Sequence, residues 1–566
     1  MKLTKVQIHN FRAIHDATFV MKSYGLLVGA NNAGKSSVID AIRAFYEKDG
    51  YKFKAGTDFP HVKPKDTESW IDLTFSLTKD EFASLADDYK FADGVLRVRK
   101  YFSTELKMHD GKSATGAIFG YKVDGTISDE PFYGAKNVQS GKFGDLIYIP
   151  AISKVDEHAK LSGPSALRDL LSDIMSDVVE GGAAYAEFSK NVKAFSDAVR
   201  DEKTADDRSL SGFEAELNEM LKPWDSAFQL KFPAPTAPEI VKSMLGWDLL
   251  DLFHGKEQGI DYYGSGFQRH FIYSLIQLGA RYTGKKAGKK VKDFSPSLNL
   301  VLFEEPEAFL HPPQQEVLAR NLALVAEAEN WQVLVATHSA NFVSKNAQDI
   351  PAITRLCRKG GITCTYQIDE AAWDELIDAN QVIAEIAKKY PKMEKRLHAD
   401  DARPEMEAVK HFLWLNPDRS AIFFANHVLL VEGATEVALI NRLVGLGKVS
   451  GADCGVYVLD CLGKYNIHRF MNLLSRLGIS HSVIHDDDNN KGEHGDLNKL
   501  IVDSADANFT RSIIPVAGDV ETLLDIPKAG SDHRKPQHVL FLLETSQIAE
   551  GKLSAFCQVV EKSLVS

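Results

Sequence analysis

The segment Gly29-Ala30-Asn31-Asn32-Ala33-Gly34-Lys35-Ser36 determines the fold class of the first part of the chain, because it fits the pattern G-x-x-x-x-G-K-[ST] in full. An apolar run, 25–28, precedes it, and residues 37–46 follow it with the apolar spacing of an amphipathic helix. In this order of strand, loop and helix, backbone N–H groups can surround phosphate oxygens, and the start of the helix adds partial positive charge. The residues expected to bind a nucleotide are Asn31, Asn32, Gly34, Lys35, Ser36 and Ser37.

Two acidic residues far downstream are expected to complete this nucleotide site. An apolar strand, 298–303, ends abruptly in Glu304 and Glu305. Adjacent carboxylates at a strand end point to opposite sides. We therefore expect Glu304 to reach Mg²⁺ together with the hydroxyl of Ser36, and Glu305 to act as the catalytic base toward water. Lys35 would neutralise the β- and γ-phosphates.

Two weaker signals belong to the same prediction. His338 follows a second apolar strand, 331–336, and could sense the γ-phosphate from that position. The small residues Gly264-Ser265-Gly266, with Gln268 behind them, stand at the start of a predicted helix, where they could form another anion site. Either signal alone also fits an ordinary helix or strand terminus.

A second site is predicted where apolar strands of the C-terminal part end in acidic residues. The four carboxylates are Glu432, Glu436, Asp486 and Asp488. Parallel strands deliver their carboxyl ends to one crevice, so these side chains should meet there, with Asp519 or Glu521 nearby. Like charges about 4 Å apart cost roughly 4 kcal/mol per pair at an effective dielectric of 20, so divalent cations should neutralise them.

Oxygen ligands of this kind suit Mg²⁺ or Mn²⁺, and two such ions can hydrolyse a phosphodiester. The alternative is an exposed acidic loop, which is most credible for residues 486–490. If the D-x-D segment is extended, Asp486 and Asp488 point the same way.

The pattern of apolar residues divides the chain into several α/β and helical parts. Alternation predicts strands at 1–11, 71–77, 95–102 and 146–150, and helical spacing predicts helices at 167–178, 185–199 and 213–221. These three helices are either a packing layer on the first α/β part or a dimerisation module. The expected domain boundaries are 1–158, 159–257, 258–371, 372–414 and 415–566.

Composition limits the classes of function that fit. The net charge of −12 means that nucleic acid would have to bind through local basic patches and metal ions. One lysine run is a solvated loop or such a patch, and its members are Lys285, Lys286, Lys289, Lys290 and Lys292. No signal peptide or membrane span is evident, which makes the cytoplasm the expected location. The five cysteines are too few and too scattered for a disulfide framework.

The nucleotide-site segments together resemble the ABC/SMC-like ATPases. The similar stretches are Ile8-His9-Asn10-Phe11-Arg12 at the first strand, Gly264-Ser265-Gly266-Phe267-Gln268 at the signature loop, the acidic segment 304–312 at the Walker B motif and D-loop, and the switch histidine His338. This resemblance implies that the signature loop completes the ATP site of a second protomer. The segment between Ser36 and Glu304 lacks the long heptads of an SMC arm, which disfavours a long-armed clamp.

The acidic strand ends resemble the Toprim motifs, and an ABC-type ATPase joined to a Toprim domain resembles the OLD (overcoming lysogenisation defect) family. Gly518-Asp519-Val520-Glu521 is similar to a further acidic motif of that family. Arg534-Lys535-Pro536 is similar to its late Lys-Pro, where Lys535 would face the scissile phosphate. The implied architecture is α/β: an ABC-type ATPase with a helical insertion, followed by a Rossmann-like Toprim domain.

The resemblance implies an ATP-binding, metal-dependent DNA endonuclease that uses Mg²⁺ or Mn²⁺ and forms a homodimer or higher oligomer. It further suggests antiphage defence, with a retron reverse transcriptase and its msDNA or a helicase-like protein as partner. The alternative is a DNA clamp or scaffold that does not cleave and whose acidic cluster is structural.

Overall fold

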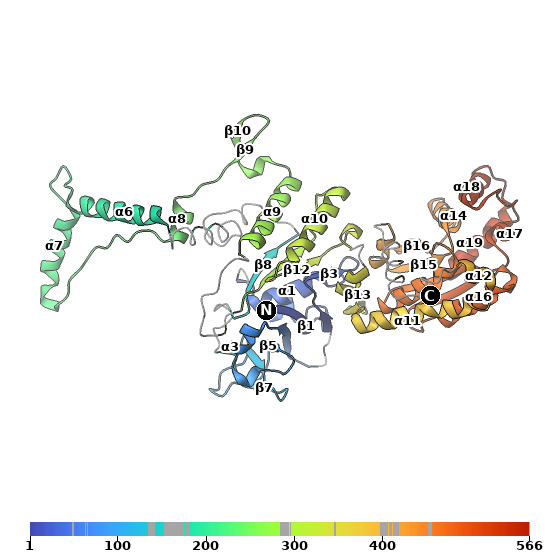
Figure 1. Cartoon of the computed structure of the whole chain (residues 1–566), viewed down its shortest axis with the longest axis horizontal. Coiled ribbons are helices and arrows are strands. Elements are labelled where there is room, and N and C mark those ends of the chain that lie inside the picture. Colours follow the sequence, from blue (N-terminus) through green and yellow to red (C-terminus); the bar gives the residue numbers. More distant parts are fainter. Residues whose placement is uncertain are drawn as a thin grey trace. The chain divides into compact units, whose positions relative to one another are not determined.

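The computed structural model contains two compact units, Met1–Ala151 with Lys290–Ser566, and Ile152–Lys289 (Figure 1). The second unit is longer than the predicted insertion, 159–257, because the helix that begins at Ser265 groups with it. The structure describes residues 1–47, 50–62, 64, 66–133, 142–151, 171, 175, 182–283, 294, 296–343, 347–396, 406, 410, 418–450 and 455–564.

The chain begins with an antiparallel sheet in the order β2-β1-β4-β5-β6-β7, which confirms the strands predicted there. Its strands are β1 (Lys2–Phe11), β2 (Ile14–Val20), β4 (Ser69–Ser76), β5 (Val95–Ser103), β6 (Ile118–Tyr121) and β7 (Ile127–Pro131), with the short helices α2 (Ala55–Asp58) and α3 (Lys79–Ser84) in the connections. Buried residues alternate along β1, and the inward set, which includes Val6 and Ile8, joins one core with Val38 and Ile42.

The second sheet, in the order β14-β13-β3-β12-β11-β8, carries the phosphate loop. Its elements are β3 (Tyr24–Val28), β8 (Asp145–Ile149), β11 (Asn299–Glu304), β12 (Trp331–Ala336), β13 (Ile353–Lys359) and β14 (Ile362–Gln367), with helices α1 (Lys35–Tyr46) and α10 (Pro312–Ala326). All strand pairs are parallel except β13 with β14. Every residue of β12 is buried, as a central parallel strand requires. The carboxyl ends of β3, β11 and β12 therefore lie at one edge.

The C-terminal part is a four-stranded parallel sheet in the order β16-β15-β17-β18. The strands are β15 (His427–Val431), β16 (Val456–Asp460), β17 (Ser480–Asp486) and β18 (Thr510–Val516), and the helices are α14 (Ala434–Gly445), α15 (Ile467–Arg476), α16 (Glu493–Asp503), α17 (Val520–Leu524), α18 (Lys535–Glu544) and α19 (Glu550–Leu564). This arrangement confirms the predicted Rossmann-like domain. It also brings the acidic strand ends to one edge.

The predicted connector, 372–414, is partly a packed element of the C-terminal part. Helices α11 (Glu370–Ala387) and α12 (Pro391–Arg396) contribute Ile383 and Met393 to a small core that also contains Leu497 of α16. The remaining residues of the connector lie mostly outside the described part of the chain.

Strand β13 also contacts the C-terminal part through a buried arginine. The Arg355 guanidinium donates hydrogen bonds to four backbone carbonyl oxygens, at distances from 3.1 to 3.3 Å. The acceptors are Phe423, Ala425, Leu477 and Gly478. No carboxylate pairs with Arg355 among the described residues, and burial lowers its pKa. The guanidinium thus satisfies four carbonyl groups of the C-terminal part.

We expect Arg355→Met to lower the melting temperature by about 5 °C, because the four carbonyl oxygens lose their donor, and each unsatisfied buried acceptor costs about 1–3 kcal/mol. The measurement is thermal unfolding followed by circular dichroism. Arg320→Met on the exposed face of α10 is the matched control and should leave the melting temperature unchanged. Equal melting temperatures for both variants and the parent would show that the interface does not depend on Arg355.

The second unit contains the helices α6 (Ala183–Asp201), α7 (Leu210–Leu221), α8 (Ala237–Ser243) and α9 (Ser265–Thr283) and the short hairpin β9 (Leu249–Asp251) with β10 (Lys256–Gln258). Helices α6 and α7 confirm two of the three predicted helices, whereas 167–178 lies almost entirely outside the described residues. Several large apolar side chains of the unit are exposed, including Phe253 at 95%. The roles considered for the insertion stay predictions.

Three expectations from composition can be compared with the described residues. The four described cysteines are free thiols, as expected, and Cys454 lies outside the described part. The lysine run from Lys285 to Lys292 lies outside it as well. In the described helices, none is long and apolar enough to cross a membrane.

Candidate functional sites

The phosphate loop leaves β3 at Val28 and packs against the β13–β14 hairpin. Gly29 has φ 142°, and a Cβ atom there would lie 2.1 Å from the carbonyl oxygen of Leu356. Gly34 has φ 108°, and a Cβ atom there would lie 2.5 Å from Oγ1 of Thr363. The Thr363 hydroxyl donates to the carbonyl oxygen of Ala33 at 3.1 Å. Both glycines are therefore required by close packing as well as by backbone conformation.

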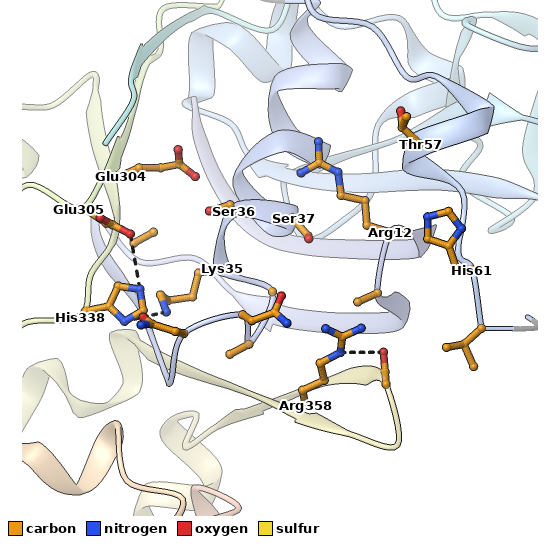
Figure 2. A pocket seen from close by; sticks show the side chains of 18 residues that line it. Arg12, Lys35, Ser36, Ser37, Thr57, His61, Glu304, Glu305, His338 and Arg358 are labelled. Atoms are coloured by element: carbon orange, nitrogen blue, oxygen red, sulfur yellow. Dashed lines mark hydrogen bonds and ion pairs between the residues drawn. The ribbon is translucent and has the colours of Figure 1, made fainter. Parts of the chain in front are cut away.

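The loop lines a cavity of about 640 Å³ that contains most of the predicted nucleotide residues (Figure 2). The predicted residues that line it are Asn31, Asn32, Gly34, Lys35, Ser36, Ser37, Glu304, Glu305 and His338. Lys35 and His338, which are 303 residues apart in sequence, thus meet at one cavity. Its size and its phosphate loop fit a nucleotide.

Lys35, His338 and Glu305 form a chain of polar contacts across this cavity. The Lys35 ammonium donates to the carbonyl oxygen of Gly29 at 2.8 Å and lies 3.3 Å from Nδ1 of His338. Nε2 of His338 lies 3.6 Å from Oε1 of Glu305. Burial lowers the pKa of Lys35 to about 8, and burial together with Lys35 lowers the pKa of His338. The anionic phosphates of a nucleotide would favour the charged lysine.

Glu304 lies at the end of β11 and is oriented differently from Glu305 (Figure 2). Burial raises its pKa, although hydrogen bonds with Tyr148 and Ser36 act in the opposite direction. The Tyr148 hydroxyl donates to Oε2 at 2.8 Å, whereas Oε1 is buried with no hydrogen-bond partner in the described structure. A buried carboxylate oxygen beside the Ser36 hydroxyl suits Mg²⁺, a cation that prefers oxygen ligands.

Sequence reasoning assigned no role to Glu307, although the acidic segment contains it. Its two carboxylate oxygens accept hydrogen bonds from the Thr337 hydroxyl at 2.8 Å and from the backbone N–H of His338 at 2.6 Å. Glu307 thus holds the loop that positions His338. The cavity is also lined by residues without a predicted nucleotide role, namely Arg12, Ala13, Ala33, Thr57, His61, Val62, Ala336, Arg358 and Gly361.

The predicted signature residues belong to the second unit. Ser265 is exposed at the first position of α9, and Gly266 follows it. The Gln268 side chain donates to the carbonyl oxygens of Ile260 at 3.2 Å and Tyr263 at 2.9 Å, so it stabilises its own loop. The ATP-binding role of Ser265, Gly266 and Gln268 stays a prediction.

The second site lies at the carboxyl edge of the C-terminal sheet. Glu432 follows β15, and its Oε1 accepts the backbone N–H of Asp486 at 3.0 Å. Glu436 lies in the first turn of α14, and its Oε2 accepts the N–H of Gly433 at 3.0 Å. Burial raises the pKa of Glu432 and of Glu436 to about 7. Burial, with the negative charges of Glu432, Glu436 and Asp488, raises the pKa of Asp486 to about 9.

The D-x-D segment differs from the extended geometry assumed from sequence. Strand β17 ends at Asp486, and a 3-10 turn begins at Asp488, which has φ 48°. Asp486 and Asp488 therefore do not lie on one face of an extended strand, as the sequence analysis assumed. The electrostatic effect of Asp488 on Asp486 nevertheless places it in the same cluster. Asp486, Asp487 and Asp488 are half-buried, whereas Asn489 and Asn490 are exposed, so the alternative of a freely exposed loop describes only the end of this segment.

Lys464 is the residue of this site that sequence reasoning missed. It follows β16 and Gly463, which has φ 101°, and its side chain is 4% exposed. Its ammonium lies 2.8 Å from Oδ2 of Asp488 and 4.0 Å from Oε1 of Glu432, and it donates to the backbone oxygen of Asp486. The stretch Leu462-Gly463-Lys464 after a strand end was the available signal, but a lysine there fits a solvated loop equally well.

Asp519, Glu521 and Lys535 were also predicted to belong to this site, and the structure places each of them in a different environment. Asp519 is the N-cap of α17 and pairs with Lys528 at 2.7 Å; although burial acts against it, these partners lower its pKa to about 2. Glu521 is 3% exposed, and its Oε1 has no hydrogen-bond partner among the described residues. The Lys535 ammonium lies 3.9 Å from that oxygen. Metal ligation by Asp519 or Glu521 and a catalytic role of Lys535 stay predictions.

The chemistry of these donors fits a divalent cation. Within the described ranges, no three His, Cys, Asp or Glu side chains form a ready-made ligand set for a metal ion. The donor atoms are nevertheless carboxylate oxygens alone, and burial together with neighbouring negative charges raises the pKa of Glu432, Glu436 and Asp486. Buried, mutually repelling carboxylates gain from an added Mg²⁺ or Mn²⁺.

Both the N-terminal and the C-terminal part of the chain match known protein domains. Residues 1–93 and 102–343 match the model of the AAA ATPase domain, and residues 423–488 match that of the "Overcoming lysogenization defect protein-like, TOPRIM domain". The chain is 26% identical to the Old nuclease of Escherichia phage P2, over 86% of this chain and 77% of that protein.

Two further relatives match over similar lengths. The identity is 22% to the OLD nuclease of Thermus scotoductus, over 97% of this chain and 96% of that protein. It is also 22% to the endonuclease GajA of Bacillus cereus, over 88% of this chain and 77% of that protein. This chain therefore belongs to the AAA ATPase domain family, and its residues 423–488 match an OLD-like Toprim domain.

Proposed function

We propose that this protein is an ATP-hydrolysing, divalent-metal-dependent DNA endonuclease. The observation that carries the proposal is the cluster of Glu432, Glu436 and Asp486 at the carboxyl edge of a parallel sheet, where burial raises the pKa of all three side chains and neighbouring carboxylates raise it further. Packing alone does not explain such a cluster, because its repulsion destabilises the fold. A phosphodiesterase site that binds cations explains the residues together, and the names of the relatives support a nuclease.

In the nuclease site, the acidic residues and Lys535 have different tasks in phosphodiester hydrolysis. Bound Mg²⁺ or Mn²⁺ would supply an activated water and stabilise the leaving oxygen. Glu432, Glu436 and Asp486 would hold the cations, and Lys535, beside Glu521, would face the scissile phosphate. In the ATPase site, Lys35 binds the phosphates, Glu305 accepts the proton of the attacking water, and His338 contacts the γ-phosphate.

Cleavage of supercoiled plasmid DNA with Mg²⁺ or Mn²⁺, compared with EDTA, tests this proposal. Metal-dependent conversion to nicked or linear DNA is expected. DNA binding without cleavage at any metal concentration would instead favour the clamp or scaffold that does not cleave.

We also propose that the ATPase works as a homodimer or higher oligomer, in which Ser265 of one protomer acts on the nucleotide held by Lys35 of another. The exposed start of α9 supports this role, because a helix N-terminus binds anions. Lys35→Ala and Ser265→Arg should each lose ATP hydrolysis alone. Mixing the two chains should restore up to about one working site per mixed dimer. Mixed dimers that form, by native mass spectrometry, and yet stay inactive would contradict action between protomers.

The proposal extends to an antiphage effector in the cytoplasm. A retron reverse transcriptase with its msDNA and a helicase-like protein are the two candidate partners. This extension depends on family resemblance alone. Copurification from the native host, followed by mass spectrometry and nucleic-acid analysis, identifies the partner.

A further inference from the structure

The hairpin formed by β13 and β14 carries two cysteines that face each other across its strands. Cys357 of β13 and Cys364 of β14 are directly opposite in the antiparallel register, and both are free thiols of intermediate exposure. Directly opposite side chains point to the same face of a sheet, with Cβ atoms about 4.5–5.5 Å apart. A disulfide needs Cβ atoms about 3.5–4.5 Å apart. The two thiols can therefore be joined by a small approach of the strands.

The other face of this hairpin packs tightly against the phosphate loop, through chain neighbours of the two cysteines. The carbonyl oxygen of Leu356 lies 2.1 Å from the position that a Cβ atom on Gly29 would take. Oγ1 of Thr363 lies 2.5 Å from the corresponding position on Gly34. Arg358 lines the nucleotide cavity itself (Figure 2). A change in the spacing of the two strands would therefore reach the nucleotide site.

The face that carries the thiols contacts the C-terminal part. Arg355 and Tyr366 are directly opposite each other and lie two residues from the cysteines, so they share that face. The Arg355 guanidinium binds carbonyl oxygens of the C-terminal part, as described above. The Tyr366 ring lies 2.5 Å from the position that a Cβ atom on Gly478 would take. The hairpin is thus held on both faces, and the thiols lie beside its contacts with the C-terminal part.

Arg355 also distinguishes the two thiols. Its guanidinium shares a side-chain hydrogen bond with Cys357, and a positive charge beside a cysteine favours the reactive thiolate. Burial raises the pKa of Cys364, and the neighbouring Cys357 raises it further. Cys357 is therefore the thiol that attacks an oxidant first, and Cys364 is placed to attack the oxidised sulfur.

We propose that Cys357 and Cys364 form a redox site in which hydrogen peroxide produces a disulfide that slows ATP hydrolysis. The Cys357 thiolate attacks one peroxide oxygen and becomes a sulfenic acid, and the other oxygen leaves as hydroxide, which takes up a proton to give water. The Cys364 thiol then attacks the oxidised sulfur. This step forms the S–S bond and releases the sulfenic oxygen as a second water. Two thiols thus lose two electrons, and one peroxide becomes two waters.

The expected effect on ATP hydrolysis follows from the tight packing of the hairpin. The disulfide requires the strands to approach by about 1 Å. Leu356 and Thr363 move with their strands, and no free space separates them from Gly29 and Gly34. The loop would therefore shift relative to the bound phosphates, and a misplacement of about 1 Å can slow a reaction about a hundredfold.

Treatment of the reduced full-length protein with hydrogen peroxide tests the inference. Mass spectrometry of the intact chain and of its peptides should show the loss of two hydrogens and a crosslink between Cys357 and Cys364. ATP hydrolysis should fall about tenfold or more and recover after dithiothreitol is added. Equilibrium binding of ATP to the same samples should weaken as well, which gives a readout that does not require turnover.

Cys357→Ser and Cys364→Ser each remove one thiol and should keep the ATP turnover of the parent before and after peroxide. Either variant suffices if the other does not fold. Cys557→Ala removes a cysteine of the C-terminal core, keeps the pair and should respond as the parent does. Separate sulfinic acids in place of the crosslink would overturn the inference. A crosslinked protein with unchanged ATP binding and turnover, or an equal loss of turnover in the serine variants, would also overturn it.

Discussion

Asp486→Asn should lower metal-dependent DNA cleavage by about a thousandfold or more, while ATP hydrolysis continues at the rate of the parent. Asp486 is the carboxylate at the centre of the cluster, since Glu432, Glu436 and Asp488 all act on it. Asparagine keeps the size of the side chain but removes the charge that would bind the cation. Plasmid cleavage over a range of Mn²⁺ concentrations, with ATP turnover measured in parallel, gives both rates.

The same substitution should stabilise the metal-free protein. Burial and neighbouring carboxylates raise the pKa of Asp486 from 3.8 to about 9, so between these values the folded state binds more protons than the unfolded state. Stability therefore falls as pH rises through this window, and Asp486→Asn removes that loss. The gain in unfolding free energy should be about 1 kcal/mol or more at pH 8 and smaller at pH 5.

Asp503→Asn, at an exposed position of α16, is the matched control and should change neither cleavage nor the pH dependence of stability. Cleavage by Asp486→Asn at the rate of the parent, in protein free of contaminating nuclease, would reject the nuclease site and favour the clamp or scaffold.

Glu305→Gln should slow ATP hydrolysis about a hundredfold or more and leave ATP bound. The Glu305 carboxylate lies 3.6 Å from Nε2 of His338 at the edge of the nucleotide cavity, where it can accept a proton from water. The amide of glutamine cannot accept that proton. Loss of a negative charge near the phosphates should also leave ATP affinity unchanged or raise it. Single-turnover hydrolysis and equilibrium binding of ATP separate the two effects.

Glu304→Gln distinguishes the two adjacent acids. Because Glu304 lies beside Ser36 and its buried Oε1 has no hydrogen-bond partner among the described residues, its amide variant should lose affinity for Mg²⁺–ATP rather than the chemical step alone. Glu329→Gln, exposed after α10, is the control and should change neither rate nor affinity. Hydrolysis by Glu305→Gln at the parental rate would show that another residue is the base.

The main elements of both α/β parts were accessible from the sequence because their signals are local. A phosphate loop needs a strand, two glycines and a helix within about twenty residues, and Val28, Gly34 and Lys35 occupy those places. The acidic strand ends were accessible for the same reason. Parallel strands place their carboxyl ends at one edge, so Glu432 and Asp486 could be expected to meet before the strand order was known.

The sequence by itself therefore determined the fold class, the nucleotide loop and the identity of the main acidic residues. Only the tertiary structure decided which charges are already satisfied. Asp519 pairs with Lys528, Lys464 lies inside the cluster, and Arg355 joins β13 to the C-terminal part. Such pairings depend on distances of a few ångströms between segments that are far apart along the chain. Local periodicity fixes the direction of a side chain within its own element, but packing between elements decides which partner it meets and how far it is desolvated.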